Sequence, residues 1–130
     1  MITGMVFGVF DGLHEGHKYF LRQALVRCNK LVVVVTVPEV AEALKKHPPQ
    51  HSFEGRVAML RKFDAQLEVI PGDKELGSWH VIRDYPPDII FLGYDQAAIA
   101  KELDQLKKPY VFLDALQPGD FKSSLLNAKT

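Results

Sequence analysis

Continuous apolar runs alternate with amphipathic stretches along the chain. The longest run has no polar alternation, which is typical of a parallel strand that is covered on both faces. The runs predict strands at residues 5–10, 30–36, 67–70, 88–92 and 110–113. Between them, apolar residues recur at the spacing of an amphipathic helix. This spacing and the N-cap preference of serine predict helices at 17–28, 40–45, 52–63 (capped by Ser52), 78–85 (capped by Ser78) and 97–107, and a last turn or two from Ser123.

The order of these elements predicts the fold class. Strands that alternate with helices form a parallel sheet with helices on both of its faces. We therefore expect an α/β fold: a single Rossmann-like, three-layer domain over residues 1–130, with a five-stranded parallel sheet. In such sheets, ligands bind beyond the carboxyl ends of the strands. That rule selects four loops, at residues 10–16, 37–51, 93–96 and 113–124.

Composition narrows the possible partners. The chain has 130 residues, with 16 Lys and Arg against 16 Asp and Glu, and the resulting zero net charge argues against a strongly basic surface for nucleic acid. No run approaches the roughly 20 apolar residues of a membrane helix, and the first residues do not resemble a signal peptide. The one cysteine, Cys28, cannot form an internal disulfide. We expect a cytoplasmic protein with neither nucleic acid nor a membrane as partner.

The most informative stretch is the first loop, which runs from Gly8 to His17 as Gly-Val-Phe-Asp-Gly-Leu-His-Glu-Gly-His. The start of a helix offers backbone N–H groups and a positive dipole end, which suit an anion. Gly8 and Gly16 allow the backbone to approach a ligand closely. His14 and His17 are three positions apart, so both imidazoles can point at one bound phosphate if the helix begins between them.

This arrangement favours phosphoryl-group chemistry. Nucleotidyl transfer builds negative charge on the α-phosphate and on the departing pyrophosphate. Hydrogen-bond donors placed where that charge develops lower the barrier without a covalent intermediate. A neutral imidazole donates one hydrogen bond, and a protonated imidazole adds a charge.

Residues 10–17, Phe-Asp-Gly-Leu-His-Glu-Gly-His, resemble the HxGH signature of the cytidylyltransferase-like nucleotidyltransferase superfamily. That superfamily includes glycerol-3-phosphate cytidylyltransferase, phosphopantetheine adenylyltransferase and archaeal-type FAD synthetase. Three further segments are similar to family motifs in the same order: 51–56, which ends in Arg56, then 92–96, Leu-Gly-Tyr-Asp-Gln, and 121–125, Phe-Lys-Ser-Ser-Leu. The resemblance therefore spans nearly the whole chain.

The resemblance implies a role for each matched residue. His14 and His17 would stabilise the transition state, and either Lys45 or Lys46 would supply the mobile basic group of the second loop. Asp11 would lie near the acceptor, while Arg56 would bind the acceptor phosphate or support the site. Gly93 and Asp95 would border the base and ribose, and residues 122–124 would hold the β- and γ-phosphates. The full set of residues that the resemblance places against the nucleotide is Gly8, Val9, Phe10, Gly16, Gly93, Asp95, Lys122, Ser123 and Ser124.

By this resemblance the chain transfers CMP or AMP from CTP or ATP to a small phosphorylated acceptor and releases pyrophosphate. Mg²⁺ would bind mainly through the nucleotide phosphates. A homodimer is a further option that the family suggests. Phosphopantetheine, FMN, a sugar phosphate and a polyol phosphate all remain open as acceptors.

Some features leave simpler interpretations open. Val9 stands where the family commonly has Thr or Ser, and Lys122 stands where Ser or Thr is commoner, so a nucleotide-binding regulatory module without turnover is the alternative function. His14 and His17 find no Cys or further His at metal-ligand spacing. The following residues have a purely structural alternative, as solvated side chains or as helix caps: Lys45, Lys46, His47, His51, Asp95, Ser123 and Ser124.

Overall fold

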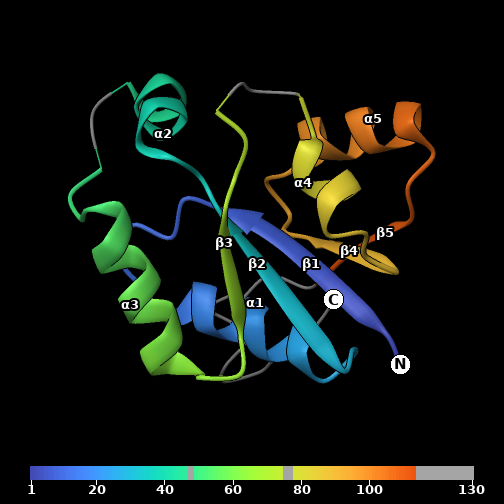
Figure 1. Cartoon of the computed structure of the whole chain (residues 1–130), viewed down its shortest axis with the longest axis horizontal. Coiled ribbons are helices and arrows are strands. Elements are labelled where there is room, and N and C mark those ends of the chain that lie inside the picture. Colours follow the sequence, from blue (N-terminus) through green and yellow to red (C-terminus); the bar gives the residue numbers. More distant parts are fainter. Residues whose placement is uncertain (47–48, 75–77, 114–130) are drawn as a thin grey trace, which may run out of the picture.

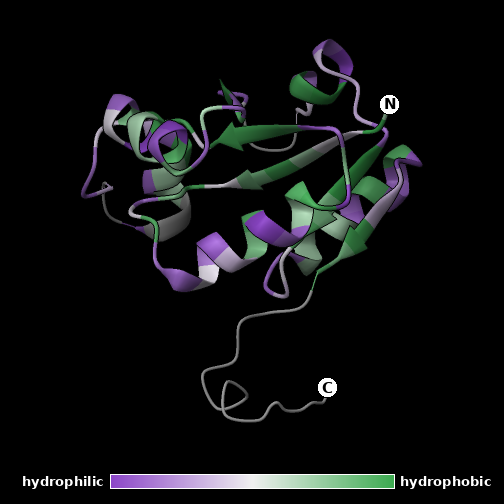
Figure 2. Ribbon diagram, turned by 90° about the horizontal axis from the view of Figure 1, so that it is seen from below, coloured by the Kyte–Doolittle hydropathy of each residue, from purple (hydrophilic) through white to green (hydrophobic). Residues whose placement is uncertain are grey.

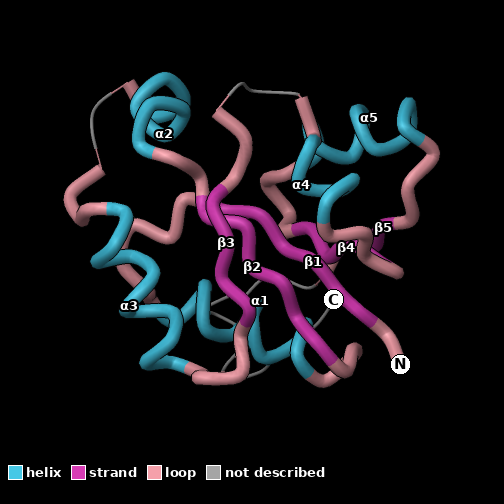
Figure 3. Tube along the Cα trace, viewed as in Figure 1, coloured by secondary structure: helices cyan, strands magenta, loops and turns pink. Residues whose placement is uncertain are grey.

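The structure is a computed structural model, and it describes residues 1–46, 49–74 and 78–113. Strands and helices alternate along this part of the chain (Figure 1). The elements in order are β1 (Thr3–Gly8), α1 (Glu15–Leu25), β2 (Lys30–Val35), α2 (Pro38–Lys45), α3 (Phe53–Phe63), β3 (Glu68–Pro71), α4 (His80–Asp84), β4 (Ile89–Leu92), α5 (Ala97–Leu106) and β5 (Tyr110–Phe112). The described strands form one parallel sheet in the order β3-β2-β1-β4-β5, with β1 at its centre (Figure 3). The predicted α/β fold is confirmed.

The strands are apolar on both sides because helices cover both faces of the sheet. Successive strand residues point to opposite faces, so Val33 and Val34 of β2 belong to two different core clusters. One cluster contains buried residues of α1 and α3, and the other contains buried residues of α4 and α5. Figure 2 shows hydrophobic strands enclosed by helices that carry hydrophilic turns. The result is the expected three-layer arrangement.

Several element boundaries differ by one to three residues from the sequence-based expectation, among them α1, which spans Glu15–Leu25 rather than residues 17–28, and three of the differences have a clear physical reason. The first strand was expected at residues 5–10 but spans Thr3–Gly8, because Phe10 has a φ of 52° and leaves the extended conformation. Helix α2 begins at Pro38, two residues earlier than expected, since proline suits the first helical position. Helix α4 begins after Trp79 rather than after Ser78, and an oxygen of Asp73 accepts the first helical N–H, that of His80, at 2.7 Å.

The strand order locates the ligand-binding edge. The chain passes from β1 outward to β2 and β3, and then crosses to β4 and β5 on the other side of β1. The topological switch point therefore lies between β1 and β4, and ligands of such sheets bind in the crevice beyond the carboxyl ends there. In the part of the chain that the structure describes, no helix has the length and apolarity required to span a bilayer.

Candidate active site

His14 is the N-cap of α1, so the helix begins between the two histidines. Its backbone is extended, and its Nδ1 accepts hydrogen bonds from the N–H groups of Gly16, at 3.1 Å, and His17, at 3.3 Å. From the sequence, the N–H groups at this helix start were expected to be free to bind an anion; in the structure these two donate to the imidazole of His14. Since Nδ1 accepts, the neutral ring carries its proton on Nε2. His14 therefore presents a ring N–H donor in place of two backbone donors.

His17 lies in the first turn of α1 and stacks on His14. The ring centroids are 3.7 Å apart and the ring planes differ by 20°. Its Nδ1 lies 3.0 Å from the carbonyl oxygen of Gly12, which can only accept, so Nδ1 carries the proton. His17 therefore donates from Nε2 only in its doubly protonated, cationic form. The pair offers one neutral N–H donor and one position for a positive charge, side by side.

The buried side chain of Phe10 packs against His17 of this pair. The two rings meet edge-on, with centroids 5.6 Å apart. A β-carbon at Gly8 would lie 2.7 Å from the Phe10 ring, so the packing of Phe10 requires glycine there. Gly12 has a φ of 95°, in the region that glycine adopts without strain. Phe10, predicted to bind nucleotide, is thus placed in the core next to His17.

Asp11 clamps the second loop onto the first. Its Oδ2 accepts from the N–H of Gln50 at 2.8 Å, and its Oδ1 accepts from the N–H and the Nδ1 of His51, at 2.9 and 3.0 Å. The hydrogen bond from Gln50, with the bonds and charge of His51, lowers the pKa of Asp11 from 3.8 to about 2. Sequence reasoning missed the pairing of His51 with Asp11, because the two residues lie in different motifs. The predicted contact of Asp11 with the acceptor stays a prediction.

Replacing Asp11 by asparagine is expected to change the acid stability profile. Because the pKa of Asp11 is depressed in the folded protein, its stabilising contribution is present above the unfolded value, 3.8, and is lost as the pH falls towards about 2. Melting temperatures measured at several pH values should therefore fall less steeply below pH 3.8 in Asp11→Asn than in the wild type. Equal slopes in the two proteins would contradict the clamp.

Arg56 is fully buried and joins the ends of two strands. Its Nη1 donates to the carbonyl oxygen of Val9 at 2.9 Å and to that of Thr36 at 2.7 Å. Its guanidinium lies 5.6 Å from the centre of the Phe53 ring. Burial lowers the pKa of Arg56, and the charge of Asp11 opposes this shift. Of the two predicted roles, these contacts support the role of holding the site together.

The turn after β4 brings Gly93 and Asp95 to the same edge. Asp95 is exposed and is not the cap of α5, whose N-cap is Gln96. The side chain of Gln96 links this turn to β1, a contact that the sequence did not predict. On the second loop, Lys45 is the last residue of α2, and Lys46 follows it exposed, with a φ of 65°. The following predicted phosphate ligands lie outside the described residues: Lys122, Ser123 and Ser124.

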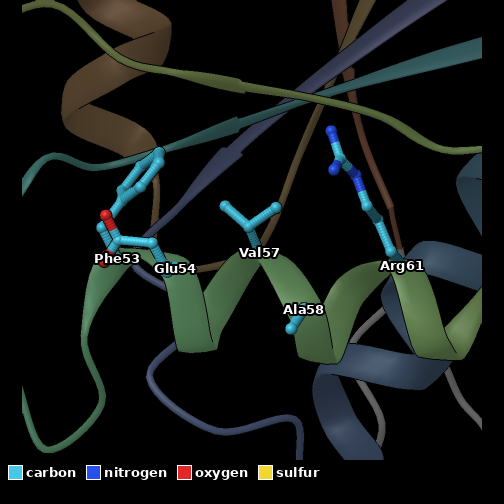
Figure 4. Close-up of a pocket in the computed structure, with 5 residues that line it drawn as sticks. All are labelled: Phe53, Glu54, Val57, Ala58 and Arg61. Carbon is cyan, nitrogen blue, oxygen red and sulfur yellow. The ribbon is translucent and has the colours of Figure 1, made fainter.

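A cavity of about 530 Å³ lies along α3. Figure 4 shows Phe53, Val57 and Arg61, which are four positions apart, projecting from one side of the helix. Its lining is completed by Glu54 and Ala58. None of the predicted site residues that the structure describes lines this cavity, and the His14–His17 pair remains the predicted centre of the chemistry.

Comparison with known proteins agrees with this geometry. The Cytidylyltransferase-like family model matches residues 5–124. FAD synthase of Thermococcus sibiricus is 35% identical over 132 residues, covering 100% of this chain and 86% of that protein. FAD synthase of Aciduliprofundum boonei is 38% identical over 81% of this chain and 69% of its own length. The crystal structure of a lipopolysaccharide core biosynthesis protein from Thermoplasma volcanium superposes with a TM-score of 0.77 at 28% identity, covering 90% of this chain and 99% of that one.

The family match thus covers the described sheet and the HxGH loop, and the relatives extend it to the whole chain. The matched region contains both the helix start with its stacked imidazoles and the switch point of the parallel sheet. The chain belongs to the Cytidylyltransferase-like family and is a nucleotidyltransferase.

Proposed function

We propose that the protein transfers AMP from ATP to FMN, which yields FAD and pyrophosphate. The observation that carries the proposal is the stacked pair of His14 and His17 at the start of α1, beside the switch point of the sheet. The relatives named FAD synthase support ATP as the donor and FMN as the acceptor. Of the acceptors that the sequence left open, FMN is the one that these relatives favour.

In the proposed reaction, a phosphate oxygen of FMN attacks the α-phosphorus of ATP. A new phosphorus–oxygen bond forms as the bond to the β-phosphate oxygen breaks, and pyrophosphate leaves with the bond electrons. The acceptor phosphate is already anionic, so it needs no general base. His14 donates its Nε2–H where negative charge accumulates, and His17 would add a second donor and a charge there in its doubly protonated form.

Mg²⁺ fits this site as a companion of the nucleotide. The described residues contain no group of three His, Cys, Asp or Glu side chains arranged to hold a metal. A magnesium ion bound chiefly by nucleotide phosphates needs no such group. When bound, it neutralises charge on the departing pyrophosphate, while the protein side chains orient the phosphates.

Release of pyrophosphate tests the proposal. Purified protein with Mg²⁺, ATP and FMN is expected to release pyrophosphate and to form FAD, detected by chromatography. CTP in place of ATP should give at least about tenfold slower release, the effect of about 1.4 kcal/mol of lost transition-state binding. Phosphopantetheine, a sugar phosphate and a polyol phosphate, each in place of FMN, serve as control acceptors. Transfer to one of these and not to FMN would contradict the acceptor assignment.

The alternative is a regulatory module that binds nucleotide without turnover, which Val9 and Lys122 motivate. Calorimetry that shows ATP binding, together with no pyrophosphate release for any acceptor of the panel, would favour this alternative. Detectable transfer would eliminate it.

A further inference from the structure

The strands β1 and β4 stop pairing before they reach the site. β1 pairs with β2 along its whole length, through Gly8, but it pairs with β4 only at Gly4 and Met5. Continuing the β1–β4 register by two residues would set Phe7 opposite Leu92. The two strands therefore stop pairing at the switch point, although β1 extends to Gly8 and β4 to Leu92.

The other pairs of strands show which hydrogen bond is missing. In each pair, the carbonyl of the last paired residue on one strand accepts a hydrogen bond from the residue that follows its partner on the other strand. Gly8, for example, pairs with Val35, and the oxygen of Gly8 accepts from the N–H of Thr36 at 2.9 Å. Leu113 N–H to Leu92 oxygen, also at 2.9 Å, follows the same pattern. Applied to β1 and β4, this pattern makes the N–H of Gly93 the donor to the oxygen of Phe7.

The carboxamide of Gln96 takes the place of that bond. The N–H of Gly93 donates to Oε1 of Gln96 at 2.9 Å, and Nε2 of Gln96 donates to the oxygen of Phe7, again at 2.9 Å. One side-chain amide thus stands between a backbone donor and a backbone acceptor that would otherwise meet. Both partly buried backbone groups keep a hydrogen-bond partner, while the side-chain amide holds the strand ends apart.

A second set of contacts links β1 to helix α5, whose N-cap is Gln96. The ring of Phe7 meets that of Trp79 edge-on, with centroids 5.3 Å apart. Trp79 donates its Nε1–H to Glu102 of α5 at 2.9 Å. Helix α5, which carries Gln96 at its start, is therefore tied to β1 through the backbone and through the side chain of Phe7.

We infer that Gln96 is a wedge that keeps the crevice between β1 and β4 open for the nucleotide, and is thereby a positioning residue for nucleotide binding. The inference rests on the proposed function and on the sequence-based prediction that Gly93 and Asp95 border the base and ribose. Gln96 would act on the nucleotide indirectly, through its hydrogen bonds to the backbone of Phe7 and Gly93. Its removal lets the two backbone groups bond directly, which closes the strand ends together without leaving either group unsatisfied.

The wedge makes an unusual prediction, a loss of binding without a loss of stability. Gln96→Ala is expected to raise the Kd for Mg-ATP at least about tenfold, the equivalent of one hydrogen bond's net contribution. Its melting temperature should stay within about 2 °C of the wild type, below the shift that 1 kcal/mol produces in a domain of this size. Gln105→Ala, an exposed glutamine on the same helix, should change neither quantity.

Gln96→Glu separates the wedge from a general packing defect. At neutral pH, a carboxylate oxygen faces the oxygen of Phe7 and the second hydrogen bond is lost. A protonated carboxyl group restores an O–H donor with nearly the shape of the amide. The Kd of this variant for Mg-ATP, divided by the wild-type Kd at the same pH, should therefore fall towards one as the pH is lowered from 7.5 to 5.

Calorimetry with Mg-ATP on the three variants and the wild type decides the question. Wild-type affinity in Gln96→Ala overturns the inference. A parallel fall of affinity and melting temperature in Gln96→Ala, with no relative recovery of Gln96→Glu at low pH, overturns it as well. Wild-type protein that binds neither ATP nor CTP is a different result, because it rejects the proposed function itself.

Discussion

Replacing His14 by alanine is expected to lower kcat by about 10²–10³-fold, the usual effect of removing one donor that stabilises transition-state charge. The same change removes the acceptor that caps α1, since Nδ1 of His14 bonds the N–H groups of Gly16 and His17. Loss of an N-cap costs about 1 kcal/mol. Pyrophosphate release and urea unfolding measure the two effects separately.

His14→Asn is the matched control for that prediction. Asparagine is among the best N-cap residues, so its side-chain oxygen should restore the cap and most of the stability. It cannot place a donor where Nε2 of the imidazole lies, and turnover should stay low. An asparagine variant with wild-type turnover would show that His14 acts only as a cap.

Replacing Arg56 by alanine is expected to have the largest effect on stability. It leaves the carbonyl oxygens of Val9 and Thr36 without their 2.9 and 2.7 Å donor and empties a fully buried volume. Cavity and unsatisfied-acceptor costs together predict a loss of about 3–5 kcal/mol in the free energy of unfolding. Urea denaturation followed by circular dichroism measures it.

Two further variants define the cause of that loss. Arg56→Met fills much of the volume and removes the buried charge, while the two carbonyls remain without a donor, so it should cost less than alanine. Arg61→Ala, at an exposed position of the same helix, should change stability by less than about 0.5 kcal/mol. If Arg56→Ala were no worse than Arg61→Ala, the bridging role would be wrong.

The sequence predicted the fold well because its signal is local. The unbroken apolar run of β2 and the helical spacing of α1 need no tertiary information, and both elements lie within three residues of the expected bounds. The exceptions arise where a contact distant in sequence decides. Phe10 continues the apolar run of β1, but its ring turns back over Gly8 and beneath His17, which ends the strand early.

The candidate site was predictable only as far as its motifs reach. His14 and His17 lie in one short segment, and their spacing placed them correctly at the start of α1. The partners of Asp11 lie 39 and 40 residues further along the chain, and Gln96 bonds a carbonyl 89 residues away. No periodicity links such positions. The folded arrangement of the strands and loops brings them together.

Three successive carbonyls at the end of β1 each support a different part of the molecule. The oxygen of Phe7 receives Gln96, that of Gly8 receives Thr36, and that of Val9 receives Arg56. The turn after β4, the end of β2 and helix α3 are therefore all anchored to three consecutive peptide groups. A substitution that displaces α3 would therefore also displace the turn after β4, so these two parts of the molecule cannot be altered independently.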